Sequence, residues 1–492
     1  MSVKHKPKVA MLGFDAAEFS YIAAHLSSLP NFSRALGRGI LRHLDSPAQI
    51  MAGSVWPTFY TASPPGEHGI HHLMQWDADA MRLRRTAADW LYCEPFWREL
   101  ERRGHRVVAL DVPMCFPSER GGAVEVSSWG AHDQLSAFSA HPRELEREIR
   151  RRFGQHPMGI EIPVEKSLAE RMRVRTNLVD GARIKGEMTR WLLTSQEWDF
   201  FIGVFGESHR GGHILWPDNA DAQEATPPSA LLDVYRALDQ ALGDLLAAID
   251  LNDTTVILFA LHGMGPNLSQ EHFVPPMMDL INVRFSELEP DLYANTGPPR
   301  QRSLMRLLRE KVPPRLQSAI ANMVPQRVRD AVVDRALTSG YDWARTPGLA
   351  VRADCNGFIR FNLVGRETQG MLEAGSAILS RYSELISESF ATLRTTDGQP
   401  LVGEVLAAAE NFPGARSDRL PDLIVMWTGL EPAAGATSAL GMLDDKLDTG
   451  RGGNHLPTGF QILLQPGLEQ PSEDSRLSIS DFARSILRMF DA

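Results

Sequence analysis

Cysteine is scarce in this chain of 492 residues. Its three cysteines, Cys93, Cys115 and Cys355, lie far apart and show no CxxC spacing. Three thiols cannot all pair with one another, so the sequence indicates neither a disulfide framework nor a cysteine-based zinc site. We therefore expect a reducing environment for the folded protein.

A surplus of positive charge is also missing, because the formal net charge is −10. A negative electrostatic field argues against a nucleic acid polymer or an anionic membrane as the main partner. It leaves room for a local basic pocket, and a small anionic molecule is the expected substrate. The sequence indicates no particular oligomeric state.

Long apolar runs are absent as well. No stretch approaches the roughly 18 apolar residues that a membrane-spanning helix needs. The N-terminal segment MSVKHKPKVAMLGFD has neither the long apolar region nor the small-residue cleavage site of a secretory signal. We expect a cytoplasmic protein without a membrane partner.

The composition that remains is that of a globular protein, with 43% hydrophobic and 23% charged residues. Apolar strand-like runs alternate with amphipathic helical stretches, which predicts an α/β fold with a mostly parallel central sheet between helices. The clearest predicted strands are residues 8–14, 106–112, 199–205 and 254–260, with short strand candidates at 423–427 and 461–464.

We expect one α/β domain over residues 1–492 with helical cap insertions. Two regions fit the sheet pattern poorly. Residues 134–195 are charged and helical, and residues 275–345 mix proline with arginine-rich helical pieces. Both are predicted to be insertions, the second of them a cap over the sheet.

Polar residues follow several predicted strands at the point where each strand ends. Asp15, the segment GESHRGGH with His209 and His213, and the pair Leu261-His262 all lie there. The carboxyl ends of parallel strands meet at one edge of a sheet, where α/β proteins bind ligands. Histidines four residues apart can bind one cation if their segment is helical. The alternatives are a helix N-cap for Asp15 and a surface position for His209 beside Arg210.

The segment IMAGSVWPTFYTASPPGEHGI, residues 50–70, carries two candidate nucleophiles, Ser54 and Thr58. A hydroxyl at a helix N-terminus lies where backbone N–H groups can hold an oxyanion or a phosphate. The alternative for Ser54 is again a helix cap. His68 is expected to stabilise its own loop, whereas His71 and His72 are candidates for a pocket mouth. A substrate-facing loop is predicted around Trp129, His132 and Asp133.

Taken in order, these motifs resemble the alkaline phosphatase superfamily in its type I phosphodiesterase and nucleotide pyrophosphatase branch. GFDAAE is similar to the first metal-ligand motif, and YTASPPGEHGI to the family's TG…P…HGI. GESHRGGH resembles Asp-x-x-Gly-His, LHGMG resembles Asp-His-Gly-Met, and GGNHLPTGF resembles Gly-x-His-x-x-x-Gly. The resemblance implies two divalent cations, usually zinc, one beside a nucleophile and one on the phosphate oxygens. Manganese and iron are the other candidates.

Carried over to this chain, the resemblance assigns Asp15 and His262 to the nucleophile-side metal, and His213 and His455 to the other. Two ligands are replaced, because Leu261 and His209 stand where the family has aspartates.

In the family, the nucleophile lies a set distance before the threonine of the Thr-Gly motif, which Thr61 matches. The same distance before Thr61 falls on Ala52, which has no hydroxyl, so Ser54 and Thr58 are the remaining candidates. Glu207 is a candidate to compensate for the lost aspartate as a metal ligand. Arg210 is a candidate phosphate clamp, with a solvated arginine as the alternative.

The leading prediction is a metal-dependent hydrolase of phosphoric esters with a Ser or Thr nucleophile. Diesters and pyrophosphates are favoured over monoesters as its substrates. A single-metal variant that cleaves a sulfate ester or a phosphonate, or transfers a group, is the second hypothesis. A catalytically silent relative that binds a ligand is the third.

Overall fold

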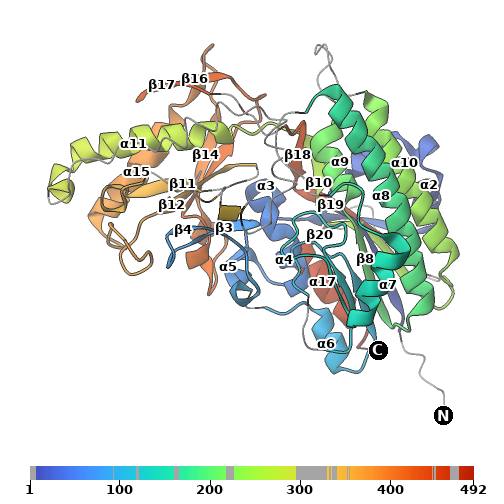
Figure 1. Ribbon diagram of the computed structural model, residues 1–492. Coiled ribbons are helices and arrows are strands. Elements are labelled where there is room, and N and C mark those ends of the chain that lie inside the picture. Colours follow the sequence, from blue (N-terminus) through green and yellow to red (C-terminus); the bar gives the residue numbers. More distant parts are fainter. Residues whose placement is uncertain are drawn as a thin grey trace.

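The computed structural model describes residues 7–491 except 92, 118–120, 160–165, 218–226, 295–327, 329, 332–333, 335–340, 352, 354, 446, 448–449 and 466–475. A large sheet crosses the centre of the main unit, with helices on both of its faces (Figure 1). Most of its neighbouring strands are parallel, which confirms the predicted fold class.

The central sheet has nine strands in the order β20-β2-β19-β9-β1-β8-β5-β6-β7. Antiparallel pairs occur where β19 meets β2 and β9, and where β6 meets β7 at the edge. In chain order the strands are β1 (Val9–Phe14), β2 (Ile40–Asp45), β5 (Val107–Leu110), β6 (Val124–Ser127), β7 (Ser139–His141), β8 (Phe200–Phe205), β9 (Thr255–Ala260), β19 (Thr458–Leu464) and β20 (Arg476–Ser478).

Apolar side chains alternate between the two faces of the central strands, because successive residues of a strand point in opposite directions. Leu12 and Phe14 of β1 join one buried cluster, whereas Val9 and Met11 join the other. The first cluster lies under α2 (Pro30–Arg38), α8 (Leu168–Ser195), α9 (Glu207–Leu215) and α10 (Pro228–Ala247); the second lies under α4 (Val55–Thr61), α6 (Trp97–Arg102) and α17 (Ile479–Arg488).

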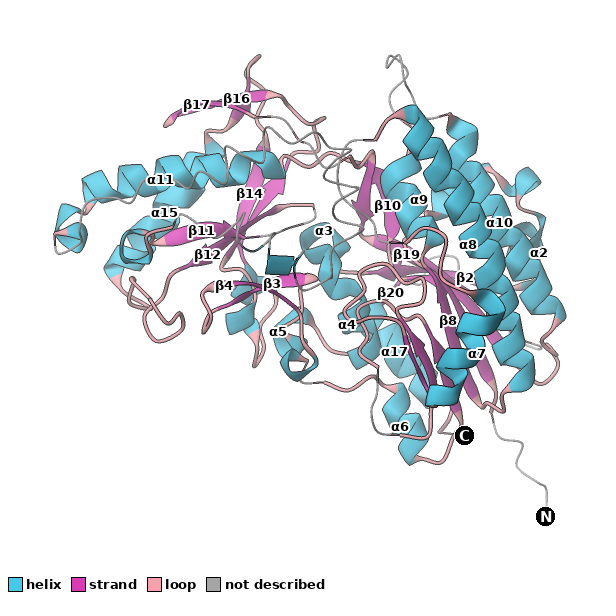
Figure 2. Ribbon diagram, viewed as in Figure 1, coloured by secondary structure: helices cyan, strands magenta, loops and turns pink. Residues whose placement is uncertain are grey.

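A smaller unit stands beside the main sheet, to the left in Figure 2. A four-stranded sheet in the order β11-β12-β15-β14 packs against two helices around its own apolar cluster. Its elements are α11 (Val274–Leu288), β11 (Gly348–Val351), β12 (Gly357–Phe361), α15 (Ala377–Ala391), β14 (Val402–Ala407) and β15 (Leu423–Trp427). The predicted strand at 423–427 therefore exists but belongs to this second sheet.

The predicted insertion at 134–195 contains β7, α7 (Arg143–Phe153) and α8. β7 extends the edge of the central sheet, and α8 packs beside α10. The predicted cap at 275–345 begins within α11, and most of the rest lies outside the described residues. Within the described part of the chain, no helix is both long and apolar enough to cross a membrane.

Candidate metal site

Asp15 directly follows β1, and its backbone N–H donates to the carbonyl of Phe205 at the end of β8 (2.8 Å). Its side chain is buried and does not cap a helix, because the cap of α1 (Phe19–Ala24) is Glu18. The Trp56 indole donates to Asp15 Oδ1 (2.8 Å), and His209 Nδ1 lies 2.6 Å from Oδ2. The carboxylate is thus held at the sheet edge by groups from two different elements.

Burial alone raises the pKa of the Asp15 carboxyl, but its neighbours outweigh that effect. The positive charge and the hydrogen bond of His209 lower the pKa most, and His262 and the Trp56 hydrogen bond lower it further. The pKa of Asp15 therefore lies well below its usual value, and the side chain is an anion at neutral pH.

His209 and His213 lie on one side of the buried helix α9, which follows β8 after Gly206. The predicted i, i+4 arrangement on a helix is present, and the two Nε2 atoms are 3.0 Å apart. His213 Nδ1 lies 2.8 Å from the carbonyl oxygen of Gly453, so Nδ1 carries the proton. The Nε2 lone pair of His213 then points toward His209.

His262 and His455 reach the same place on a two-stranded antiparallel ribbon. β10 (Gly263–Pro266) begins directly after His262, and β18 (Gly453–Leu456) pairs with it so that Met264 faces His455. The ring centroid of His455 lies 4.9 Å from that of His209 and 4.9 Å from that of His262. Residues far apart in the sequence thus meet at the carboxyl edge of the sheet, as predicted.

Burial lowers the pKa of two of these imidazoles, those of His213 and His262. The pKa of His213 lies well below its usual value, chiefly through burial and then through the positive charge of Arg451. Burial lowers the pKa of His262 to about 4, although the Asp15 carboxylate acts in the opposite direction. Imidazoles that stay neutral near pH 7 keep a lone pair for a cation.

His132 joins the cluster from the loop that follows β6. Its ring centroid lies 3.9 Å from that of His209 and 5.8 Å from that of His213. The sequence predicted only a substrate-facing loop here, because β6 itself was not expected. Its position after a parallel strand is the signal that could have found it.

Two groups of three side chains fit a metal ion. One is His132, His209 and His213, and the other is Asp15, His209 and His262; within each group the ligand atoms lie within 4.8 Å of one another. Imidazole nitrogen with at most one carboxylate oxygen is a donor set that zinc and iron accept, whereas manganese prefers oxygen ligands. The structure brings together all of the predicted metal ligands except Glu207.

A cavity of about 20 Å³ opens beside the cluster, with room for one water molecule or one ion. Four histidines in its lining, His132, His209, His262 and His455, are here called the imidazole wall. The lining residues Ala52, Gly53 and Trp56 are called the alanine wall. The remaining lining residues are Asp15, Pro113, Met114 and Asp133.

The two predicted nucleophiles are not among the described residues that line the cavity. Ser54 is fully buried, and its hydroxyl donates to the carbonyl of Met51 (2.6 Å). His68 Nδ1 accepts from the Ile70 N–H (3.0 Å), so its Nε2 carries the proton and donates to Thr58 Oγ1 (3.1 Å). A histidine that donates to a hydroxyl does not act as its base.

Glu207 and Arg210 do not contact the cluster either. Glu207 Oε1 pairs with His156 Nε2 (2.9 Å), away from His209 on the helix. Arg210 donates to the carbonyls of Ala131 (2.9 Å) and Gly159 (3.2 Å). Arg210 therefore holds the loop that contains Ala131, and Glu207 holds His156.

Leu261 points away from the site. It is fully buried and belongs to the apolar cluster on the α4 and α17 face of the sheet. His71 and His72 are buried as well, and neither is among the described residues that line the cavity.

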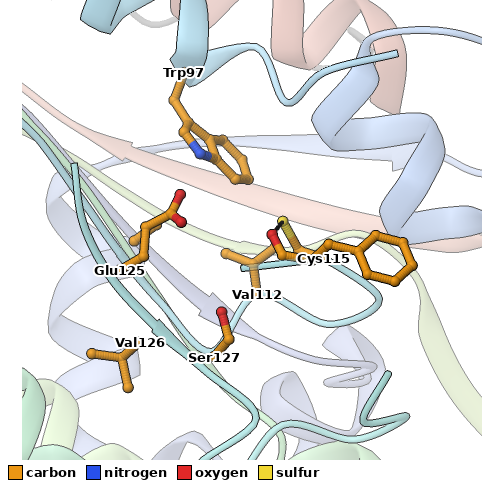
Figure 3. Close-up of a pocket in the computed structure, with 8 residues that line it drawn as sticks. Trp97, Val112, Cys115, Glu125, Val126 and Ser127 are labelled. Carbon is orange, nitrogen blue, oxygen red and sulfur yellow. Dashed lines mark hydrogen bonds between the residues drawn. The ribbon is translucent and has the colours of Figure 1, made fainter. Parts of the chain in front are cut away.

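A second cavity of about 10 Å³ lies between α6 and the strands β5 and β6 (Figure 3). Trp97 lies on one side of it, and Glu125 and Cys115 lie on the other. Burial raises the pKa of the Cys115 thiol, which disfavours the reactive thiolate. This cavity has room for no more than one water molecule, and none of the predicted site residues lines it.

Comparison with solved structures shows the same fold in three relatives. Murine ectonucleotide pyrophosphatase/phosphodiesterase 5, an inactive threonine-to-alanine variant in complex with AMP, has a TM-score of 0.53 and 12% identity, covering 99% of this chain and 95% of that chain. Phosphonoacetate hydrolase from Sinorhizobium meliloti 1021 in complex with phosphonoacetate has a TM-score of 0.52 and 14% identity, covering 99% and 96%. Wild-type alkaline phosphatase PafA has a TM-score of 0.53 and 12% identity, covering 100% and 97%. No curated protein matches the sequence.

The motifs quoted from the sequence are also recognised as a family pattern. Residues 9–345 match the family described as type I phosphodiesterase / nucleotide pyrophosphatase. That range includes Asp15, α9 and His262, whereas His455 on β18 lies C-terminal to it. The chain belongs to the type I phosphodiesterase/nucleotide pyrophosphatase family.

Proposed function

We propose that this protein is a metal-dependent hydrolase of small anionic phosphoric esters, of the phosphodiesterase or pyrophosphatase type. Its family is named for these reactions. The observation that carries the proposal is the buried imidazole cluster with an ionised Asp15 at the carboxyl edge of the sheet. A bound cation would offset the cost of burying this donor set, in which five imidazole rings and a carboxylate lie close together.

A divalent cation held there would neutralise phosphate oxygens and acidify water, which are the two contributions a metal makes to phosphoester cleavage. The residues that would hold it are drawn from His132, His209, His213, His262, His455 and Asp15. Arg451 adds a positive charge close enough to lower the pKa of His213. With the cation bound, these residues would form a preorganised pocket for an anion.

We further propose that water attacks the substrate phosphorus directly, without a covalent enzyme intermediate. The alanine wall offers no hydroxyl at Ala52, and the hydroxyls of Ser54 and Thr58 are engaged in the interior. In this single displacement a water oxygen forms the new bond to phosphorus and loses its proton. The bond to the leaving oxygen breaks, and that oxygen takes a proton.

The stereochemistry at phosphorus tests this mechanism. Purified protein loaded with zinc is given a chiral phosphorothioate diester in ¹⁸O-labelled water. One displacement inverts the phosphorus centre, and a covalent intermediate retains it. Inversion, with unchanged turnover in Ser54→Ala, is the expected result. Retention that disappears in Ser54→Ala would overturn the proposal of direct attack.

A second candidate function is ligand binding without turnover. Ala52 in the cavity wall favours it, together with a relative that is inactive as a threonine-to-alanine variant yet is in complex with AMP. Calorimetric titration of the metal-loaded protein with AMP separates the candidates. Binding of AMP, with no hydrolysis of any aryl phosphate diester, pyrophosphate or phosphonate, would favour the binding role.

A further inference from the structure

We infer that His132, His209 and His213 form a three-imidazole site for one divalent cation, and that Asp15 orients His209 from outside that site. The inference rests on the metal dependence in the proposed function and deepens it. It adds a ligand, His132, and it moves Asp15 from ligand to orienting carboxylate.

The first argument is the direction in which the rings of His209 and His213 face. The Nδ1 of His209 faces the Asp15 carboxylate, and the Nδ1 of His213 faces the Gly453 carbonyl. Both Nδ1 atoms therefore have partners outside the pair, and the two Nε2 atoms face each other at 3.0 Å. A cation at this point would contact both rings.

The second argument is spacing. Zinc binds imidazole nitrogen at about 2.0–2.1 Å in a tetrahedron, which places two such nitrogens roughly 3.3 Å apart. The pair in α9 is already close to this value, and the ligand atom of His132 lies within 4.8 Å of both. Three imidazoles with one open position are a known catalytic zinc arrangement.

The third argument is that the loop of His132 is rigidly held. The Asp111 carboxylate accepts from the N–H groups of Trp129 (2.7 Å) and Gly130 (2.7 Å). Lys185 Nζ, fully buried on α8, lies 2.7 Å from Asp111 Oδ2, the oxygen that also accepts from the Gly130 N–H. A buried ion pair of this kind fixes the loop backbone just before His132.

The opposite side of α9 holds the same loop. Arg210 donates to the carbonyl of Ala131, next to His132, and Glu207 pairs with His156. A Cβ added at Gly130 would come within 2.5 Å of the His156 ring, so the loop packs directly on that ring. One helix therefore supplies two imidazoles and also fixes the position of the third.

Asp15 is placed as an orienting group by its contacts. Its Oδ2 lies on the Nδ1 of His209, the nitrogen opposite to the one that faces His213. Carboxylates in this position fix the ring and raise its basicity, and their loss costs about 10- to 100-fold in metal affinity. Loss of a direct ligand costs more, roughly 100- to 1,000-fold for one ligand of a structural-strength zinc site.

The test is zinc affinity and stoichiometry in the full-length protein, measured by chelator competition and elemental analysis. The cobalt-substituted protein adds an absorption spectrum that reports tetrahedral imidazole ligation. We expect one ion per chain in the wild type. His132→Ala should lose roughly 100- to 1,000-fold in affinity and Asp15→Asn about 10- to 100-fold. His272→Ala, which removes a partly buried histidine whose Nε2 bonds the Ala433 carbonyl, is the control and should bind as the wild type does.

His132→Asp keeps a ligand at the same position and should recover part of the affinity lost in His132→Ala. Thermal unfolding of each metal-free variant checks that it folds, and His132→Asp carries the test if the alanine variant does not. The inference is overturned if His132→Ala binds zinc like the wild type, or if Asp15→Asn and His262→Ala lose more zinc affinity than His132→Ala does. It is also overturned if the wild type binds no ion.

The outcomes separate this inference from the proposed function. Zinc-dependent turnover with wild-type affinity in His132→Ala would keep the function and discard His132 as a ligand. A zinc site that depends on His132, in a protein with no phosphoester turnover, would keep the site and discard the hydrolase.

Discussion

The two walls of the central cavity differ in chemistry. The imidazole wall carries four histidines, and a fifth, His213, lies directly behind it. The alanine wall carries Ala52 and Gly53, and its nearest hydroxyl, Ser54, bonds the Met51 carbonyl in the interior. One wall is built to bind a cation, and the other has no group that could attack a substrate.

The difference teaches that metal binding and nucleophilic attack are separable parts of this fold. The imidazole wall is supported by elements behind it, including α9 and the loop after β6. The alanine wall is closely packed, since a Cβ at Gly53 would lie 2.5 Å from the carbonyl oxygen of His71. A change of ligand in the imidazole wall should therefore leave the alanine wall in place, and a change of the nucleophile position in the alanine wall should leave the imidazole wall in place.

The largest effect is expected behind the imidazole wall, at Lys185. Lys185→Met leaves the buried carboxylates of Asp111 and Glu207 without their cation, which should cost about 3–5 kcal/mol of unfolding free energy. Urea unfolding measures the loss. Arg183→Met, on the exposed side of the same helix, is the control and should stay within about 0.5 kcal/mol of the wild type. Equal losses in the two variants would contradict the supporting role of Lys185.

The next effect is expected within the cluster, at His213. His213→Ala removes one imidazole and should lower zinc affinity roughly 100- to 1,000-fold, equivalent to about 3–4 kcal/mol. Chelator competition measures it. His141→Ala, on the edge strand β7, should bind zinc as the wild type does. Unchanged affinity in His213→Ala would remove α9 from the metal site.

A pH effect of intermediate size is expected under the alanine wall. Burial lowers the pKa of His68 to about 3, whereas an unfolded histidine titrates near 6.5. Below pH 6.5 the unfolded chain binds a proton that the folded chain does not, so stability is present above pH 6.5 and falls toward pH 3.

Between pH 7 and pH 4.5 the metal-free wild type should lose on the order of 2 kcal/mol more than His68→Gln does. Urea unfolding at both pH values measures the difference. The two proteins losing the same amount would show that His68 is not held neutral.

A smaller effect is expected from a hydroxyl placed on the alanine wall. Ala52→Ser adds one oxygen to the cavity surface and should raise phosphodiester turnover at least about tenfold, or 1.4 kcal/mol in the barrier. It should also change the stereochemical outcome from inversion to retention. Ala62→Ser, beyond the end of α4, is the control. Turnover that falls in Ala52→Ser would show that the wall tolerates no added group.

The smallest effect is expected at Ser54. Ser54→Ala removes the hydrogen bond to the Met51 carbonyl, which should cost about 1 kcal/mol of stability and leave turnover unchanged. Urea unfolding and steady-state kinetics on one preparation measure both quantities. A loss of turnover without a loss of stability would place the hydroxyl of Ser54 in the reaction.

Much of the main sheet could be predicted because its central strands are continuous apolar runs. Residues 9–14, 200–205 and 255–260 are buried on both faces and fall where the pattern predicts. β2, with the sequence ILRHLD, and the short β6 were not expected, because polar residues interrupt them. The smaller unit was missed as well, because its strands are short and pair only with one another.

The site residues could be predicted where a motif directly follows a strand, or where two histidines are one helical turn apart. Asp15, His209 and His262 follow central strands, and the structure places them together. Glu207 and Arg210 could not be assigned, because their direction on α9 and their partners depend on the loop after β6. Ser54 and Thr58 looked reactive in sequence, but nothing in the sequence reveals which carbonyl or ring their hydroxyls meet.

The pairing of β10 with β18 has a consequence for insertions and deletions. His455 faces Met264 in this ribbon, and successive residues of a strand point to opposite sides. A slip of one residue would turn the imidazole of His455 away from the cavity and bring Asn454 or Leu456 into its place. A single residue added between Gly453 and His455 should therefore disconnect that ring from the others while leaving the fold intact.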